Sequence, residues 1–144
     1  MTPITAFTGD YRWLSNFYSC SVELDGEVYS SVEHAYQAAK TLNLEDRAII
    51  RHAPTAAIAK KLGRKIDIRP DWDKLKVSIM EYLLIQKFND TNLKQKLLNT
   101  GDAQLIEGNY WGDIFWGVCR GVGENNLGKL LMNIRNYENS TPHD

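Results

Sequence analysis

The chain has few of the side chains that hold disulfides and metal ions. Its 144 residues include two cysteines, Cys20 and Cys119, and three histidines. None of them stands in the Cys-x-x-Cys or His-x-x-x-His spacing that is typical of zinc sites. We therefore expect two free thiols in a reducing compartment, a cytoplasmic protein and no metal site.

Long apolar runs and an excess of one charge are also absent. No apolar run reaches membrane-spanning length, and residues 1–10 lack the basic and apolar regions of a signal peptide, so no membrane partner is expected. The formal net charge is −1, which argues against extensive contact with nucleic-acid phosphates but permits a pocket for one nucleotide. No dinucleotide-binding or P-loop glycine motif occurs, and no cofactor is expected.

The elements that the chain does contain are typical of a small α+β protein. Asp25-Gly26 separates two strand-like segments, and this pair tolerates the positive φ angles of a two-residue hairpin turn. Helical periods are predicted over residues 44–52, 56–62 with Gly63 as the C-terminal stop, 70–88, 91–98 and from 125 onward. We predict an α+β fold, a helix-rich single domain over residues 1–137 with a small antiparallel sheet, and a frayed polar tail over 138–144.

A further helix is predicted from Ser30 to Lys40. Ser30 and Glu33 have the spacing of a capping box. Glu33, Gln37 and Lys40 then place an acid, an amide and an amine on one helical face, beside an apolar stripe that would let this face line a pocket floor. Alternatively, Glu33 only caps the helix and Lys40 is only solvated. On this stretch alone the second interpretation is favoured, because capping boxes are commoner than active sites.

Two loops combine aromatic rings with hydrogen-bonding side chains. Residues 13–18 place Ser15 and Asn16 among three aromatic rings, which suits a planar ligand, although the rings could equally be core and Asn16 a turn former. Residues 107–113 form a glycine-rich turn with two aromatics, an amide and a carboxylate. Trp72 lies in the first turn of the longest predicted helix, where its ring can lean over a cavity. The basic connector 64–69 is either a solvated loop or a contact for phosphate.

Three segments together resemble the YbiA/NADAR family of N-glycosidases over almost the whole chain. They are Leu14-Ser-Asn-Phe-Tyr18, Tyr29-Ser-Ser-Val-Glu-His-Ala-Tyr-Gln-Ala-Ala-Lys40, and Asn109-Tyr-Trp-Gly-Asp113 with Asn126-Leu-Gly-Lys-Leu-Leu-Met-Asn-Ile-Arg135. The resemblance implies an α+β fold and cleavage of a ribose–nitrogen bond in a nucleotide-like substrate. Family substrates include early riboflavin-pathway intermediates and compounds related to NAD and ADP-ribose, among them ADP-ribosylated guanine.

The resemblance also implies site residues. It carries over Glu33, Trp72 and Asp113 to the active site and Asn16, Phe17 and Lys40 to the pocket. We further expect binding contacts from Ser15, Gln37, Asn109 and Trp111. The chain departs from the family pattern at Ile114-Phe-Trp-Gly-Val-Cys119, which is bulky where small and polar residues are usual.

We expect Glu33 to stabilise a ribosyl cation or orient water, and Asp113 to act as acid/base or to hold a ribose hydroxyl. Trp72 and Phe17 would stack on the base, and Asn16 would hydrogen-bond its edge or a ribose hydroxyl. Lys40 either keeps Glu33 ionised as a cation or attacks the anomeric carbon as a neutral amine. Two other functions remain open: a nucleotide sensor without catalysis, and an eraser of ADP-ribosyl groups on nucleic acid.

Overall fold

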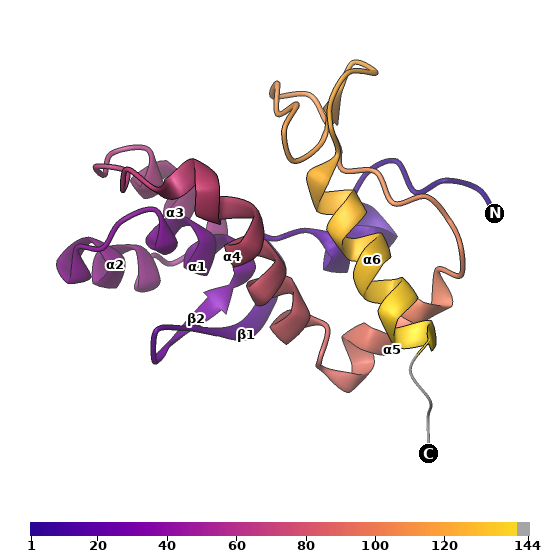
Figure 1. Ribbon diagram of the computed structural model, residues 1–144, viewed down its shortest axis with the longest axis horizontal. Coiled ribbons are helices and arrows are strands. Elements are labelled where there is room, and N and C mark those ends of the chain that lie inside the picture. The colour runs from indigo at the N-terminus through magenta and orange to yellow at the C-terminus, as the bar shows by residue number, and fades with distance from the viewer. Residues whose placement is uncertain (141–144) are drawn as a thin grey trace. The chain divides into compact units, whose positions relative to one another are not determined.

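A computed structural model describes residues 1–140 of the chain (Figure 1). The backbone forms two compact units. The central unit is Asn16–Lys87, and the terminal unit combines Met1–Ser15 with the chain from Phe88 onward. Helices dominate, and the longest strands form one antiparallel pair, which confirms the predicted α+β class with a small antiparallel sheet.

The central unit is built around one short, fully buried helix. The hairpin of β1 (Ser19–Leu24) and β2 (Glu27–Ser31) turns at Asp25 and Gly26, whose φ angles of 51° and 87° are those the sequence predicted for a tight turn. It leads into α1 (Val32–Ala39), in which every residue is buried. The helices α2 (Leu44–Arg51), α3 (Ala56–Gly63) and α4 (Trp72–Lys87) pack against α1, as Figure 1 shows.

The start of α1 differs from the prediction by one residue. The N-cap is Ser31, whose hydroxyl accepts a hydrogen bond from the His34 amide at 3.0 Å, so Ser30 and Glu33 do not form a capping box. The Ser31 hydroxyl also lies 2.6 Å from His34 Nδ1, while His34 Nε2 lies 3.0 Å from the Ala53 carbonyl. A neutral imidazole protonated on Nε2 satisfies both contacts, because it donates to the carbonyl and accepts from the hydroxyl.

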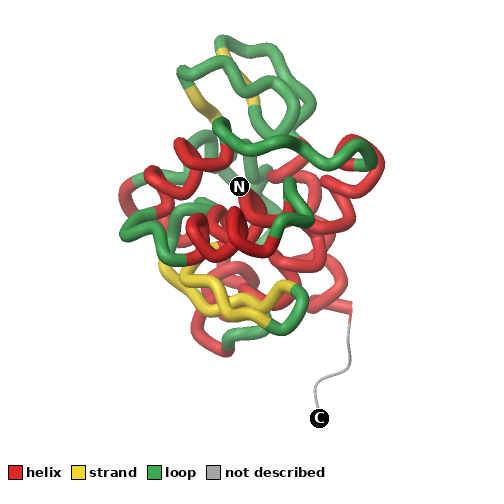
Figure 2. The backbone as a smooth tube through the Cα atoms, turned by 90° about the vertical axis from the view of Figure 1, so that its left-hand side faces the viewer, coloured by secondary structure: helices red, strands yellow, loops and turns green. Residues whose placement is uncertain are grey.

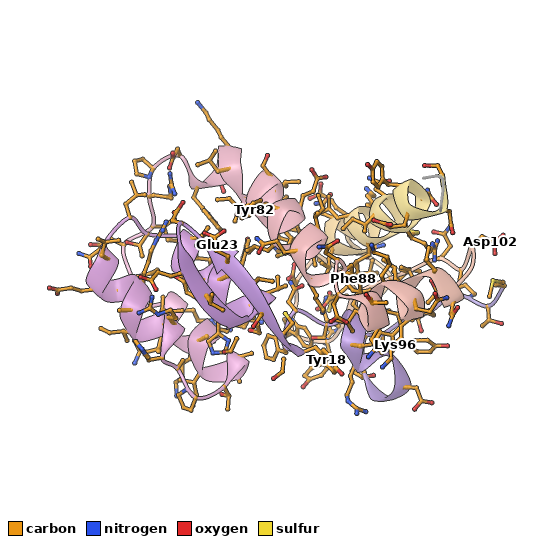
Figure 3. All side chains as sticks on the ribbon, turned by 90° about the horizontal axis from the view of Figure 1, so that it is seen from below. Tyr18, Glu23, Tyr82, Phe88, Lys96 and Asp102 are labelled. Atoms are coloured by element: carbon orange, nitrogen blue, oxygen red, sulfur yellow. The ribbon has the colours of Figure 1, made fainter. Side chains whose placement is uncertain are left out.

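Side chains from two helices hold the hairpin in place. The amide of Gln86 pairs with the backbone of Glu23, accepting from its N–H at 2.8 Å and donating to its carbonyl at 2.9 Å. The Tyr82 hydroxyl donates to the Glu23 carboxylate at 2.7 Å (Figure 3 labels both residues). From α2, Arg47 binds Asp25 at 2.6 Å. Contacts from α4 to β1 and from α2 to the turn therefore hold the hairpin that precedes α1.

The terminal unit contains η1 (Gly9–Leu14), α5 (Thr91–Asn99), the short parallel pair β3 (Gly108–Asn109) and β4 (Val118–Cys119), and α6 (Asn126–Ser140). Figure 2 shows the strands of this pair and of the hairpin in yellow. Because α6 continues through Ser140, residues 138–140 of the predicted frayed tail are helical, and residues 141–144 lie outside the described part. Within residues 1–140, no helix is both long and apolar enough to span a bilayer.

Candidate active site

The buried carboxylate of Glu33 lies in the first turn of α1. Glu33 is 6% exposed, and one of its carboxylate oxygens accepts a hydrogen bond from Gln37 Nε2 at 2.9 Å. Its backbone N–H donates to the carbonyl of Asn16 at 3.0 Å, which ties the loop containing Asn16 to the start of the helix. The positive end of the helix dipole favours the ionised carboxylate at this position. Glu33, Gln37 and Asn16 are thus adjacent, although 17 positions separate Glu33 from Asn16 in the sequence.

Two of these residues contain buried acceptor atoms without a partner. Asn16 Oδ1 and Gln37 Oε1 are buried and make no hydrogen bond within the described residues. The Asn16 amide donates only to the weak acceptor Met80 Sδ, at 3.5 Å. A buried polar atom without a partner costs about 1–3 kcal/mol, so two of them beside a buried carboxylate are unusual in a region that serves only for packing. Hydroxyl or amine groups of a ligand would satisfy them.

Lys40 forms the C-terminal cap of α1 and is partly buried. Its ammonium lies 5.6 Å from the centre of the Tyr36 ring, and Tyr36 in turn packs against Trp72 with ring centres 5.1 Å apart. Burial lowers the pKa of Lys40, and the positive charges of Lys60, Arg64 and Lys76 lower it further, while Glu33 acts in the opposite direction. Lys40 is therefore a better source of neutral amine than an exposed lysine.

The two rings that were expected to stack on a base differ in accessibility. Phe17 is 43% exposed, with the ammonium of Lys60 5.9 Å from its ring centre. Trp72 is buried, and its indole packs against Tyr36. Phe17 thus offers an open ring surface, whereas Trp72 supports Tyr36 and, through it, the position of Lys40.

In the terminal unit, Asn109 and Asp113 organise one loop. Asn109 Nδ2 donates to the Glu107 carboxylate and to the Asp113 carbonyl, each at 2.9 Å, and Asn109 Oδ1 accepts from the Asp113 amide at 3.1 Å. Asp113 Oδ1 accepts from the amides of Phe115 and Trp116 at 3.1 and 2.9 Å. These bonds use the whole Asn109 amide for architecture and leave Asp113 Oδ2 without a partner within residues 1–140.

Exposed aromatic rings extend from the same loop. Trp111 is 53% exposed, and its ring lies edge-on to that of Tyr110, which is 88% exposed, with centres 5.2 Å apart. In the bulky segment 114–119, Ile114 is exposed while Phe115 and Trp116 pack edge-on against each other. Ser15 ends η1 and donates its backbone N–H to the Arg12 carbonyl. A hollow of about 590 Å³ in this unit contains none of the predicted site residues in its lining.

The structure therefore groups the predicted residues by unit. The central unit brings together Glu33, Gln37, Lys40, Asn16, Phe17 and Trp72, and the terminal unit holds Ser15, Asn109, Trp111 and Asp113. The sequence pattern did not identify Tyr36, which was placed in the apolar stripe, nor Lys60 and Lys76. Their helical spacing is that of any solvated lysine, so no signal in the sequence distinguished them. In the part of the chain that the structure describes, no three His, Cys, Asp or Glu side chains form a metal-binding group.

Comparison with known proteins gives consistent results. The model of the NADAR domain matches residues 6–137. The chain is 38% identical over 132 residues to an N-glycosidase of Nostoc punctiforme, covering 87% of this chain and 84% of that protein. It is 35% identical over 133 residues to the N-glycosidase YbiA of Escherichia coli K12, covering 88% and 81% of the two chains. The solved NMR structure of E. coli YbiA matches with a TM-score of 0.84 at 32% identity, over 99% of this chain and 90% of that one.

A longer relative shares the same region. The chain is 37% identical over 130 residues to a riboflavin biosynthesis protein of Vibrio vulnificus, and this match covers 88% of the chain but 35% of that protein. The chain thus corresponds to about a third of the Vibrio protein and to most of the two N-glycosidases.

Proposed function

This chain belongs to the NADAR family, as its motifs predicted, and on that premise we propose that it hydrolyses a ribose–nitrogen bond in a small nucleotide-like substrate. The predicted enzyme class, a hydrolase of N-glycosyl compounds, is confirmed at the level of the family by relatives named N-glycosidases. The Vibrio relative's name supports a ribosylamino-pyrimidine phosphate of the riboflavin pathway as the substrate, and compounds related to NAD and ADP-ribose are the alternatives.

The observation that carries the proposal is the environment of Glu33. The carboxylate is buried, it does not have the capping role that the sequence suggested, and unpartnered acceptor atoms of Asn16 and Gln37 lie beside it. Lys40, seven residues later, has a pKa lowered by its own burial, and the charge of Glu33 acts in the opposite direction. Perturbed ionisable groups of this kind are typical of functional sites.

In the proposed reaction the bond between the anomeric carbon and the base nitrogen breaks, with positive charge developing on the sugar. Water supplies a hydroxyl group to the anomeric carbon and a proton to the departing base. Glu33 stabilises the ribosyl cation and orients the water, and its fixed position avoids reorganisation during the reaction. The role of acid/base is assigned to Asp113 from the family resemblance alone.

Lys40 has two proposed roles, and a trapping experiment separates them. As a cation it keeps Glu33 ionised. As a neutral amine it attacks the anomeric carbon, the base leaves with one amine proton, and the ring C–O bond opens with the second proton going to the ring oxygen, which gives an imine with the opened sugar. Water then hydrolyses the imine to the free sugar and the lysine amine. The lowered pKa of Lys40 favours the amine. With the covalent role, borohydride added during turnover links the sugar to Lys40, and Lys40→Arg loses activity because a guanidinium stays protonated. Full activity of Lys40→Arg would exclude the covalent role.

The experiment that tests the proposal is product analysis by mass spectrometry. The protein is incubated with a ribosylamino-pyrimidine phosphate, NAD, ADP-ribose and ADP-ribosylated guanine. We expect release of a free base from one of them, loss of that release in Glu33→Gln, and full activity in Glu45→Gln, which neutralises an exposed glutamate of α2. Recovery of every compound intact despite measurable binding would replace hydrolysis by a sensor function. Cleavage of ADP-ribosylated guanine alone would identify the nucleic-acid eraser.

A further inference from the structure

The positive charges of the central unit are unevenly distributed. The whole chain has a net charge of −1. Yet the short stretch from the end of α3 to the start of α4 contains two acids, Asp67 and Asp71, and five cations: Lys60, Lys61, Arg64, Lys65 and Arg69. A local excess of this size in a nearly neutral protein indicates a contact with an anion more readily than a general role in solubility.

Backbone contacts place this basic stretch at the C-terminal end of α1. The Arg69 N–H donates to the carbonyl of Lys40 at 2.7 Å. The helix α3 packs against α1, and Gly63 lies directly over the side chain of Gln37. On the same helix, the Lys60 ammonium lies over the ring of Phe17, which follows Asn16 in the loop tied to Glu33. The cations therefore border the candidate site.

Two of these cations belong to the helix that packs against α1: Lys60 lies in the last turn of α3, and Arg64 is its C-terminal cap, directly after Gly63. The positive charges of both, together with that of Lys76 in α4, lower the pKa of Lys40. Lys76 shares its charge with Asp73 at 3.2 Å, and Arg69 is paired with Asp71 at 2.7 Å. Arg64 is exposed, and within residues 1–140 its guanidinium makes no ion pair or hydrogen bond, whereas its backbone N–H donates to the Lys61 carbonyl. The group around Lys40 thus has a net positive charge, which an anionic ligand would relieve.

We propose that Lys60, Arg64 and Lys76 form a subsite for the phosphate group of the substrate at the C-terminal end of α1. This inference rests on the proposed function and adds which substrates the enzyme would prefer. Lys40 follows Glu33 by seven residues, so the two ends of α1 are about 10 Å apart at 1.5 Å per residue. The sugar carbon reacts near Glu33, and the phosphate is held by the guanidinium fork of Arg64 and the two ammonium groups. A phosphorylated ribosyl compound is then preferred over its nucleoside.

The test measures binding of ribose 5-phosphate and of ribose by isothermal titration calorimetry, which does not depend on catalysis. We compare the wild-type protein with Lys60→Gln/Arg64→Gln and with the control Lys61→Gln/Lys65→Gln. The control removes the same number of charges from exposed positions of the same stretch that do not act on Lys40. Melting temperatures check that both variants are folded.

We expect the wild-type protein to bind ribose 5-phosphate at least tenfold more tightly than ribose. The Lys60/Arg64 variant is expected to lose at least tenfold in affinity for the phosphorylated sugar only, and the control is expected to lose less than twofold. Equal losses in the two variants, or no preference for the phosphorylated sugar, would overturn the subsite. If the variant loses affinity as expected but the wild-type protein cleaves none of the ribosyl compounds, the subsite stands and the proposed hydrolysis fails.

Discussion

Gly63 is predicted to control the position of the Gln37 side chain and, through it, that of Glu33. A Cβ atom at Gly63 would lie 2.0 Å from Gln37 Oε1, 2.8 Å from its Cδ and 3.1 Å from its Cβ. Gln37 is 4% exposed, so its side chain has little room to move away without losing the hydrogen bond to Glu33. Gly63→Ala therefore tests packing and catalysis together.

The expected magnitude follows from two opposing effects. Alanine in a helix is favoured over glycine by about 1 kcal/mol, whereas overpacking a core costs about 1–3 kcal/mol. Losing a hydrogen bond to a charged group costs about 1.5–3 kcal/mol more. We expect Gly63→Ala to lower the free energy of unfolding by about 1.5–5 kcal/mol. We expect it to lower kcat/KM by about tenfold, which corresponds to about 1.4 kcal/mol of transition-state stabilisation.

The assay is urea unfolding combined with turnover in a double-mutant cycle. Gln37→Ala removes the two atoms that clash most severely, so Gly63→Ala should cost less in the Gln37→Ala background, with a coupling energy above about 0.5 kcal/mol. A Gly63→Ala variant that is more stable than the wild-type protein, with effects additive to those of Gln37→Ala, would refute this reasoning.

Three further predictions concern α1, α4 and the terminal loop. Ser31→Ala is expected to lower the free energy of unfolding by about 1–2 kcal/mol because it removes the N-cap of α1. Ser30→Ala should change this free energy little. If urea unfolding shows a larger loss for Ser30→Ala than for Ser31→Ala, Ser31 is not the cap. Burial lowers the pKa of Lys87 from 10.5 to about 8. Between pH 8 and 10.5 the unfolded chain therefore binds more protons at this lysine than the folded protein does. The free energy of unfolding of the wild-type protein should rise by up to about 3 kcal/mol as pH increases through that range. The free energy of unfolding of Lys87→Met should lack this pH dependence and should exceed that of the wild-type protein at pH 7. A Lys87→Met variant less stable than the wild-type protein at both pH 7 and pH 10 would contradict this prediction. Asp113→Asn keeps an oxygen for the Phe115 and Trp116 amides, so it should fold normally while kcat falls about 100-fold or more if Asp113 is the acid/base; unchanged kcat would limit Asp113 to holding the loop.

How well the sequence predicted an element depended on how local its determinants are. The Asp25-Gly26 turn and the helix over 91–98 were predicted correctly because their signals lie within the element itself. The capping box was wrong because Ser30 and Ser31 are both acceptable caps, and the contact between Ser31 and His34 decides between them. Gly63 was predicted as the stop of a helix over 56–62, and α3 ends at Gly63 itself, one residue later. The sequence did not report the space that Gly63 leaves for Gln37.

In the candidate site, too, local features were predicted from the sequence and tertiary contacts were not. Helical spacing alone predicted that Glu33 and Gln37 share a face, and their hydrogen bond agrees with it. The approach of Asn16 to Glu33 depends on tertiary structure, and so does the effect of Lys60, Arg64 and Lys76 on the pKa of Lys40. These contacts join residues from separate elements, so no periodicity in the sequence reports them. Only the resemblance predicted that Asn16 and Glu33 belong to one site, and the structure shows that the Glu33 N–H donates to the Asn16 carbonyl.

Hydrolysis in water enriched in oxygen-18 tests the central claim most directly. The substrate cleaved in the product analysis is incubated with the wild-type protein and with Glu33→Gln, and an unlabelled sugar standard in the same buffer corrects for spontaneous exchange at the anomeric carbon. If the ribose–nitrogen bond is hydrolysed, the wild-type protein should release an unlabelled base and a sugar that carries one oxygen-18 atom from water. Glu33→Gln should release neither product above background. Equal product formation by the two proteins would contradict the role of Glu33, and a labelled base would place the cleavage at a different bond.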